Sequence, residues 1–105
     1  MLVNKKQTYD PKDILSIKLV NGDEIIARLV EETESSFIIE NPLTVIPSER
    51  GIALVQTLFS ADINKNIEVK FDHILLHAAT VKQVADHYLQ TTTGIVRATP
   101  GGIIA

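Results

Sequence analysis

The sequence contains no cysteine among its 105 residues, which excludes disulfides, thiolate nucleophiles and sulfur-ligated metal ions. It also lacks any apolar run near the roughly 20 residues that a membrane-spanning helix needs. The N-terminus, "MLVNKKQTYDPKD", has no apolar stretch of the kind found in signal peptides. We therefore expect a cytoplasmic protein that does not insert into a membrane.

Clusters of lysine and arginine, the usual footprint of nucleic-acid binding, are also missing. The formal net charge is −3, with nine acidic and six basic residues in positions 1–50 and four of each in positions 51–105. Any RNA site must therefore be local, and must be built partly from neutral groups or from the symmetry of an assembly.

Motifs of catalytic and nucleotide-binding sites are missing as well. Ser35 and Ser36 precede an apolar strand rather than a helix, so they do not form a nucleophile elbow. Gly101 and Gly102 end the chain, whereas a phosphate-binding loop leads into a helix. Five glutamates are candidates for paired catalytic carboxylates: Glu24, Glu31, Glu32, Glu34 and Glu40. We prefer to interpret these glutamates as part of a solvated face and an acidic loop. The sequence therefore predicts no catalytic residue, no enzymatic activity and no cofactor.

Two histidines are the best candidates for metal ligands. His73 and His77 are four residues apart on a predicted strand, so they project from the same face, near Asp72. With Asp72 or His87 they could hold a metal ion. No third ligand stands at a recognised spacing, and two incidental histidines on a half-exposed strand are the preferred interpretation.

The chain is long enough for one domain, and 45% of its residues are apolar. A domain of this size buries only about 60–70% of its unfolded surface, which favours stabilisation by association. Residues 1–13 are polar and are expected to fray. Residues 95–105 form an apolar, glycine-rich tail, expected either to be disordered or to dock on a neighbour.

A β-meander is predicted from residue 14 onward. "ILSIKLV" alternates with a period of two, and Asn21 and Gly22 predict a type I′ hairpin turn. "EIIARLVEE" is apolar on both faces, which predicts a bent strand buried on two sides or a subunit interface. "FIIEN" is a third strand that Pro42 limits, with "LTVI" as its extension.

Two further strands and one helix complete the predicted fold. "IALVQTLF" is a fourth strand, and "IEVKF" with "HILLHAA" is a fifth, broken or bulged at Asp72. The five short strands are spaced as in a small barrel. "TVKQVADHYLQTTTG" has helical periodicity, with a capping box from Thr80 and Gln83 and Gly94 as the residue after its last turn.

Residues 14–41 resemble the first signature motif of the Sm and Sm-like family, which includes bacterial RNA chaperones. The match lies in "IKLVNGDEIIARLVEE" and "SSFIIEN", with Gly22 in the tight turn, and residues 67–78 stand where the second signature falls. The resemblance implies a mainly β fold for residues 14–94, a small, strongly bent, five-stranded antiparallel Sm-like barrel. The C-terminal helix, predicted from periodicity, departs from the family, whose helix is N-terminal. Divergent members of this kind occur in tailed bacteriophages.

The resemblance also implies an RNA site made of two loops. The family's acidic residue and asparagine fall on Thr33 and Ser36, and its Arg-Gly pair falls on Lys70 and Phe71, followed by His73. Lysine is a point charge and cannot stack as arginine does, but an aromatic ring stacks on any base. These five residues are the predicted contacts to single-stranded RNA.

Assembly is predicted from the fourth strand, "IALVQTLF", which is too apolar to remain a free sheet edge. In Sm-like rings the fourth strand of one subunit pairs with the fifth of the next, so a homo-oligomeric ring is expected. Two functions stay open: a non-enzymatic ring that binds RNA, and a structural ring that has lost RNA binding. The second would engage a protein partner through its helix or its 95–105 tail.

Overall fold

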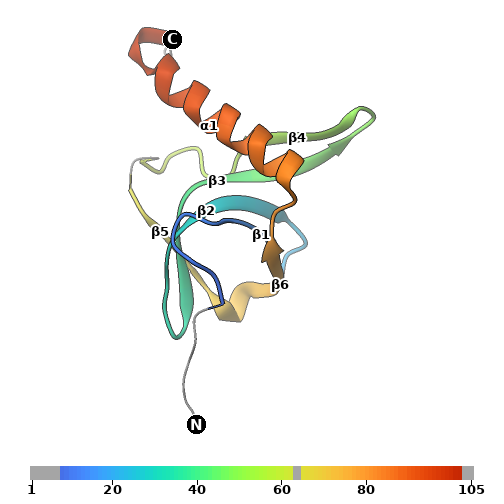
Figure 1. Cartoon of the computed structure of the whole chain (residues 1–105), viewed down its shortest axis with the longest axis vertical. Helices are drawn as coiled ribbons and strands as arrows, with labels where there is room; N and C mark the ends of the chain where they lie inside the picture. The colour runs from blue at the N-terminus through green and yellow to red at the C-terminus, as the bar shows by residue number, and fades with distance from the viewer. Residues whose placement is uncertain (1–7, 63–64, 103–105) are drawn as a thin grey trace.

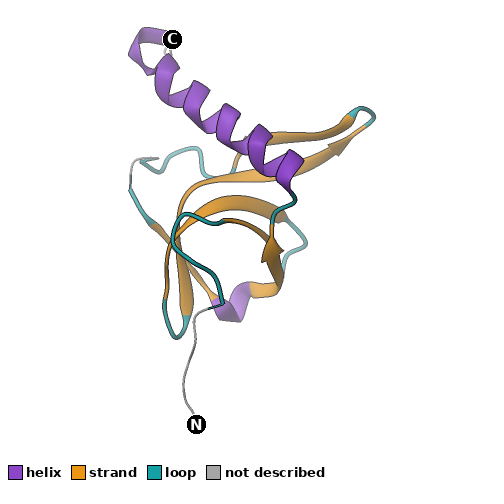
Figure 2. Cartoon of the chain, viewed as in Figure 1, coloured by secondary structure: helices purple, strands orange, loops and turns teal. Residues whose placement is uncertain are grey.

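The computed structural model describes residues 8–62 and 65–102. It is mainly β, with one antiparallel sheet crossed by a C-terminal helix (Figures 1 and 2). The elements in chain order are β1 (Ile14–Leu19), β2 (Glu24–Glu32), β3 (Ser36–Ser48), β4 (Gly51–Gln56), β5 (Ile67–Lys70), the short 3₁₀ helix η1 (Phe71–His73), β6 (Ile74–Ala79) and α1 (Lys82–Gly102). No helix within the described ranges has the length and apolar character needed to cross a membrane.

The sheet has six strands in the order β4-β3-β2-β1-β6, with β5 paired to β3 beside β4. The sequence predicts five strands, because the fifth is a single element broken at Asp72. In the structure η1 divides that element, so that β5 pairs with β3 and β6 pairs with β1. The sheet does not close on itself: within the described residues, β4 and β5 on one side and β6 on the other each pair with a single strand.

The β1–β2 hairpin is confirmed, but its turn differs from the predicted type I′. The amide of Gly22 donates to the carbonyl of Leu19 at 2.9 Å, and the amide of Leu19 donates to the carbonyl of Asp23 at 2.8 Å. Gly22 has φ +99°, while Asn21 is not among the described residues with positive φ. A type I turn followed by a left-handed glycine gives this pattern. Asn21 contributes its side chain, whose Oδ1 accepts the Asp23 amide at 2.9 Å.

Replacing Gly22 with alanine should therefore destabilise the protein by about 1 kcal/mol. An added Cβ would meet no atom within 4 Å, so the cost comes from the φ of +99° alone. Urea unfolding followed by circular dichroism measures it. Val20→Ala in the same loop is the control, because Val20 is 53% exposed and its truncation should change little. Equal stability of Gly22→Ala and Val20→Ala would contradict the turn assignment.

The third strand continues past Pro42 by means of a bulge. Arg28 of β2 faces Glu40 of β3, and Ile26 faces Leu43, so the two strands differ by one residue across this step. Asn41 lies in the bulge with φ +51°, a left-handed conformation that asparagine tolerates better than most residues. β3 therefore extends over 13 residues and pairs first with β5 and then with β4.

Strand β2 is buried on both faces within the chain, as one of the two sequence alternatives predicts. Its inner face joins the larger cluster of buried residues: Leu15, Ile17, Ile25, Ala27, Leu29, Phe37 and Ile39. Ile26 on the outer face joins a second cluster with Leu43 and Tyr88, which we call the helix cluster. The bent sheet thus encloses the larger cluster on its inner face, and α1 packs against its outer face through the helix cluster.

Helix α1 lies across β3 and β4 in Figure 1, with Val84 and Tyr88 in the helix cluster. Two details of the predicted helix are wrong. Thr80 does not cap it in the expected way, because its hydroxyl pairs with Ser16 Oγ at 2.8 Å. The helix also continues past Gly94 to Gly102, so residues 95–102 of the predicted tail are helical, and residues 103–105 lie outside the described residues.

The segment before β1 is bonded to the sheet, although the sequence predicts fraying through residue 13. The amide of Lys12 donates to the carbonyl of Leu29 at 2.7 Å, and the amide of Leu29 donates to Asp13 at 2.8 Å. Glu32 Oε1 accepts the amides of Thr8 and Tyr9. Residues 8–13 are thereby held against β2, and residues 1–7 of the predicted segment lie outside the described residues.

Candidate functional site

Four of the five residues predicted to bind RNA lie together where β2, β3 and β5 meet. Ser36 faces Lys70 in the β3–β5 register, and the amide of Phe71 donates to the carbonyl of Ser35 at 2.9 Å. Thr33 belongs to the same turn. The topology therefore brings the two predicted loops side by side, although they are more than 30 residues apart in the sequence.

Thr33 and Ser36 hold the β2–β3 turn together. Their hydroxyls are 2.8 Å apart, Thr33 Oγ1 accepts the Ser36 amide at 2.9 Å, and Ser36 Oγ is buried with the rest of its side chain at 0% exposure. The amide of Thr33 also donates to the carbonyl of Ser36 at 2.9 Å. Ser36 is therefore a structural residue of the turn, and a ligand in solution cannot reach its hydroxyl.

Phe71 is half-buried and belongs mainly to the inner core. Its ring meets Phe37 edge to face, with centroids 5.0 Å apart and an interplanar angle of 78°. Lys70 and His73 on either side of it are exposed. The His73 carbonyl accepts the amide of Val20, which ties η1 to the β1–β2 loop. Of the predicted contacts, Lys70 and His73 thus present the most accessible side chains.

Tyr9 and His77 extend the Phe37–Phe71 pair into an aromatic group that the sequence analysis missed. Tyr9 Oη lies 2.8 Å from His77 Nδ1, and the two ring centroids are 5.5 Å apart. Both rings meet Phe37 edge to face, at 5.9 Å for Tyr9 and 5.1 Å for His77. Local patterns give no signal for this group, because Tyr9 and His77 are 68 residues apart.

A pocket of about 260 Å³ opens beside this aromatic group. Its walls include Phe71, Leu75 and His77, and its polar side includes Glu32. Burial is the main reason that the pKa of Tyr9 is raised, and the carboxylates of Glu32 and Asp13 add to the effect. Tyr9 therefore keeps its proton throughout the physiological pH range.

The two histidines considered as metal ligands do not share one strand as predicted, because His73 belongs to η1 and His77 belongs to β6. In the residues that the structure describes, no three His, Cys, Asp or Glu side chains come together as a metal site. The imidazole of His77 is occupied by Tyr9, and His73 lies on η1 rather than on the same strand.

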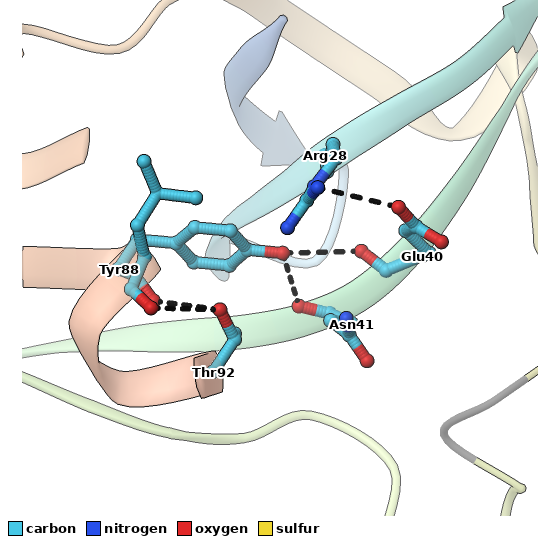
Figure 3. A network of polar contacts seen from close by, with 6 residues as sticks. Arg28, Glu40, Asn41, Tyr88 and Thr92 are labelled. Carbon is cyan, nitrogen blue, oxygen red and sulfur yellow. Dashed lines mark hydrogen bonds and ion pairs between the residues drawn. The ribbon is translucent and has the colours of Figure 1, made fainter. Parts of the chain in front are cut away.

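A polar network under α1 connects the helix to the bulge in β3 (Figure 3). The Tyr88 hydroxyl lies 2.8 Å from the Asn41 carbonyl oxygen and 3.2 Å from that of Glu40, and its one proton is shared between them. A bulge leaves ladder carbonyls without a cross-strand partner, so Tyr88 satisfies groups that the bulge exposes. Thr92 Oγ1 donates to the Tyr88 carbonyl at 3.0 Å, one turn along the helix.

The charged members of this network are Arg28 and Glu40, whose side chains are 30% and 36% exposed. Arg28 Nε lies 3.4 Å from Glu40 Oε2, an ion pair without hydrogen-bond geometry, and Nε makes no hydrogen bond to a described residue. Burial raises the pKa of Tyr88 to about 12, against a smaller lowering by Arg28. We interpret the network as the anchor of α1, because the tyrosine at its centre is completely buried.

No protein-family model and no curated protein matches this chain.

Proposed function

We propose that this chain is a non-enzymatic Sm-like protein that assembles edge to edge into a homo-oligomeric ring and binds single-stranded RNA. The observation that carries the proposal is the pair of strand edges, β4 and β6, at opposite sides of one bent sheet. Long apolar edges that stay unpaired invite association. A head-to-tail contact between two different edges generates a ring when its rotation closes.

Exposed apolar side chains on both edges support this assembly. On β4, Ile52 is 38% exposed and Val55 is 42% exposed, and on β6, Leu76 is 67% exposed. A small soluble domain gains stability when such residues are covered. Pairing β4 of one copy with β6 of the next would cover both sets and would satisfy the backbone groups along each edge.

RNA binding is proposed at the Lys70 end of the sheet. Lys70 is exposed beside the half-buried ring of Phe71, and a lysine ammonium suits a phosphate as a point charge. The net charge of −3 argues against binding over a wide surface. A ring would repeat one lysine per subunit around its axis, which would concentrate positive charge without a basic cluster in the sequence.

Replacing Lys70 with alanine should weaken RNA binding by about tenfold. It should also make the slope of log affinity against log salt concentration shallower, by about the amount that one phosphate contact per site contributes. Fluorescence anisotropy with short U-rich and A-rich RNAs at two salt concentrations measures both effects. Lys82→Ala is the charge-matched control, because the Lys82 side chain is 86% exposed at the start of α1. Equal affinities for the two variants would place the RNA site elsewhere.

A second candidate function is a structural ring that binds protein instead of RNA. The observation that favours it is the use of Ser36 in the β2–β3 turn and of Phe71 in the core. Helix α1, with Leu89 37% exposed, would then offer the contact surface. An intact ring without RNA binding at low salt, where any basic surface shows itself, would favour this candidate over the first.

A further inference from the structure

The pocket of about 260 Å³ beside the aromatic group is lined by both apolar and polar side chains. Phe71 and Leu75 supply apolar surface, and Leu75 is 61% exposed in the absence of a ligand. Glu32 and His77 supply the polar groups. An apolar wall with a few convergent polar groups is typical of a site for a small ring-shaped ligand.

The Glu32 carboxylate is held in place by the segment that precedes β1. Its Oε1 accepts the amide of Thr8 at 3.0 Å and the amide of Tyr9 at 3.1 Å. Both of these bonds use the same oxygen, so Oε2 keeps its acceptor capacity. A fixed carboxylate with a free oxygen recognises ligands that donate hydrogen bonds.

The His77 imidazole is oriented by Tyr9, whose hydroxyl lies 2.8 Å from Nδ1. When Nδ1 accepts the hydroxyl proton, the imidazole carries its own hydrogen on Nε2. His77 then carries a donor at Nε2, and both His77 and Glu32 line the pocket. The pocket therefore pairs a hydrogen-bond acceptor with a hydrogen-bond donor.

We propose that this pocket binds a guanine base. Guanine carries two adjacent donors, N1–H and the N2 amino group, which share the free Oε2 of Glu32, and its O6 accepts from His77 Nε2. The flat base lies against Phe71 and Leu75, in the way that unstacked RNA bases are bound by aromatic and apolar side chains. This inference rests on the proposed function in so far as the guanine belongs to an RNA strand.

The other three bases fit this pair of groups less well. Uracil has one N–H donor with a carbonyl oxygen on each side, and a carboxylate repels these two oxygens. Adenine and cytosine each offer an amino group next to a ring nitrogen that is itself an acceptor, so their second position opposes Glu32. The pocket therefore selects guanine, because uracil, adenine and cytosine would each leave a hydrogen-bonding group of the pocket without a partner.

The test compares GMP with AMP, UMP and CMP by NMR titration of the full chain, and G-containing with U-only single-stranded RNA by anisotropy. The expected result is at least tenfold tighter binding of GMP and of G-containing RNA. Glu32→Gln should remove this preference, because the amide oxygen still accepts the Thr8 and Tyr9 amides while the NH₂ group opposes the guanine donors. Glu31→Gln, the same change at the exposed neighbouring position, should keep the preference.

Leu75→Ala is the second variant, chosen because an exposed wall residue can be shortened without disturbing the core. It should weaken GMP binding several-fold. The inference is overturned by equal affinity for all four nucleotides, or by a guanine preference that survives in Glu32→Gln. Base-independent RNA binding that depends on Lys70 would leave the proposed function intact while rejecting the guanine pocket. GMP binding without any RNA binding would do the reverse.

Discussion

Replacing Tyr88 with alanine should destabilise the protein by about 3–5 kcal/mol, the usual cost of removing a large aromatic side chain from a core. Tyr88 is 0% exposed and joins α1 to Ile26 and Leu43 in the helix cluster. Its loss would leave a cavity and two bulge carbonyls without their donor. Urea unfolding monitored by circular dichroism gives the free energy. Leu89→Ala, on the same helix and 37% exposed, is the control and should cost far less.

Tyr88→Phe isolates the hydroxyl and should cost about 1–3 kcal/mol, since the Glu40 and Asn41 carbonyls then lose their shared donor. Burial raises the pKa of Tyr88 from the ordinary tyrosine value of 10.0 to about 12, so the fold favours the protonated form. This contribution to stability is complete below pH 10 and is lost as the pH rises from about 10 through about 12.

Stability measured across this alkaline window separates Tyr88 from the other tyrosine. Tyr88→Phe should show a smaller decline than the wild type, whereas Tyr9→Phe should keep most of it, because Tyr9 is less buried. An identical decline in the wild type and in Tyr88→Phe would show that the hydroxyl does not hold the helix in the way the geometry indicates.

Replacing Leu76 with aspartate should dissociate the proposed ring into single chains of 11.6 kDa. Leu76 is 67% exposed on β6, so the isolated subunit accommodates a carboxylate there at little cost. In an edge-to-edge contact the same carboxylate would be desolvated without a partner, which is strongly unfavourable. Light scattering after size-exclusion chromatography measures the mass. An unchanged mass would mean that β6 is not at a subunit contact.

Val20→Asp is the matched control for this experiment. It makes the same kind of change at a residue that is 53% exposed, but in the β1–β2 loop rather than on a free edge. The assembly should survive it. Dissociation by both variants would point to a general effect of added negative charge on a chain that already carries −3.

The strands and the helix could be predicted from the sequence because their signals are local. Alternation in "ILSIKLV" and helical spacing around Tyr88 depend on neighbouring residues only. The sequence predicts the position of the turn at Gly22 correctly but not its type. Asn-Gly favours type I′, whereas the structure has a type I turn followed by a left-handed glycine. The predicted helix end at Gly94 was wrong, because α1 runs on to Gly102.

The arrangement of the candidate site depended on long-range contacts, which local patterns do not reveal. Tyr9 belongs to a segment with no periodicity, and it is placed by Glu32 and His77, which are 23 and 68 residues away. Ser36 was assigned to the ligand by position in a motif, but the β2–β3 turn uses its hydroxyl. Lys70 stays a prediction, and the structure shows it exposed at the end of β5.

The proposed ring depends on strands β4 and β6, each of which pairs with only one strand in the described residues. The measurement that tests it is the mass of the purified protein in solution, by native mass spectrometry over a hundredfold range of concentration. A single closed oligomer, with a mass that is one fixed multiple of 11.6 kDa, is the predicted result. A monodisperse monomer at every concentration would contradict the account, since β4 and β6 would then be stable as free edges.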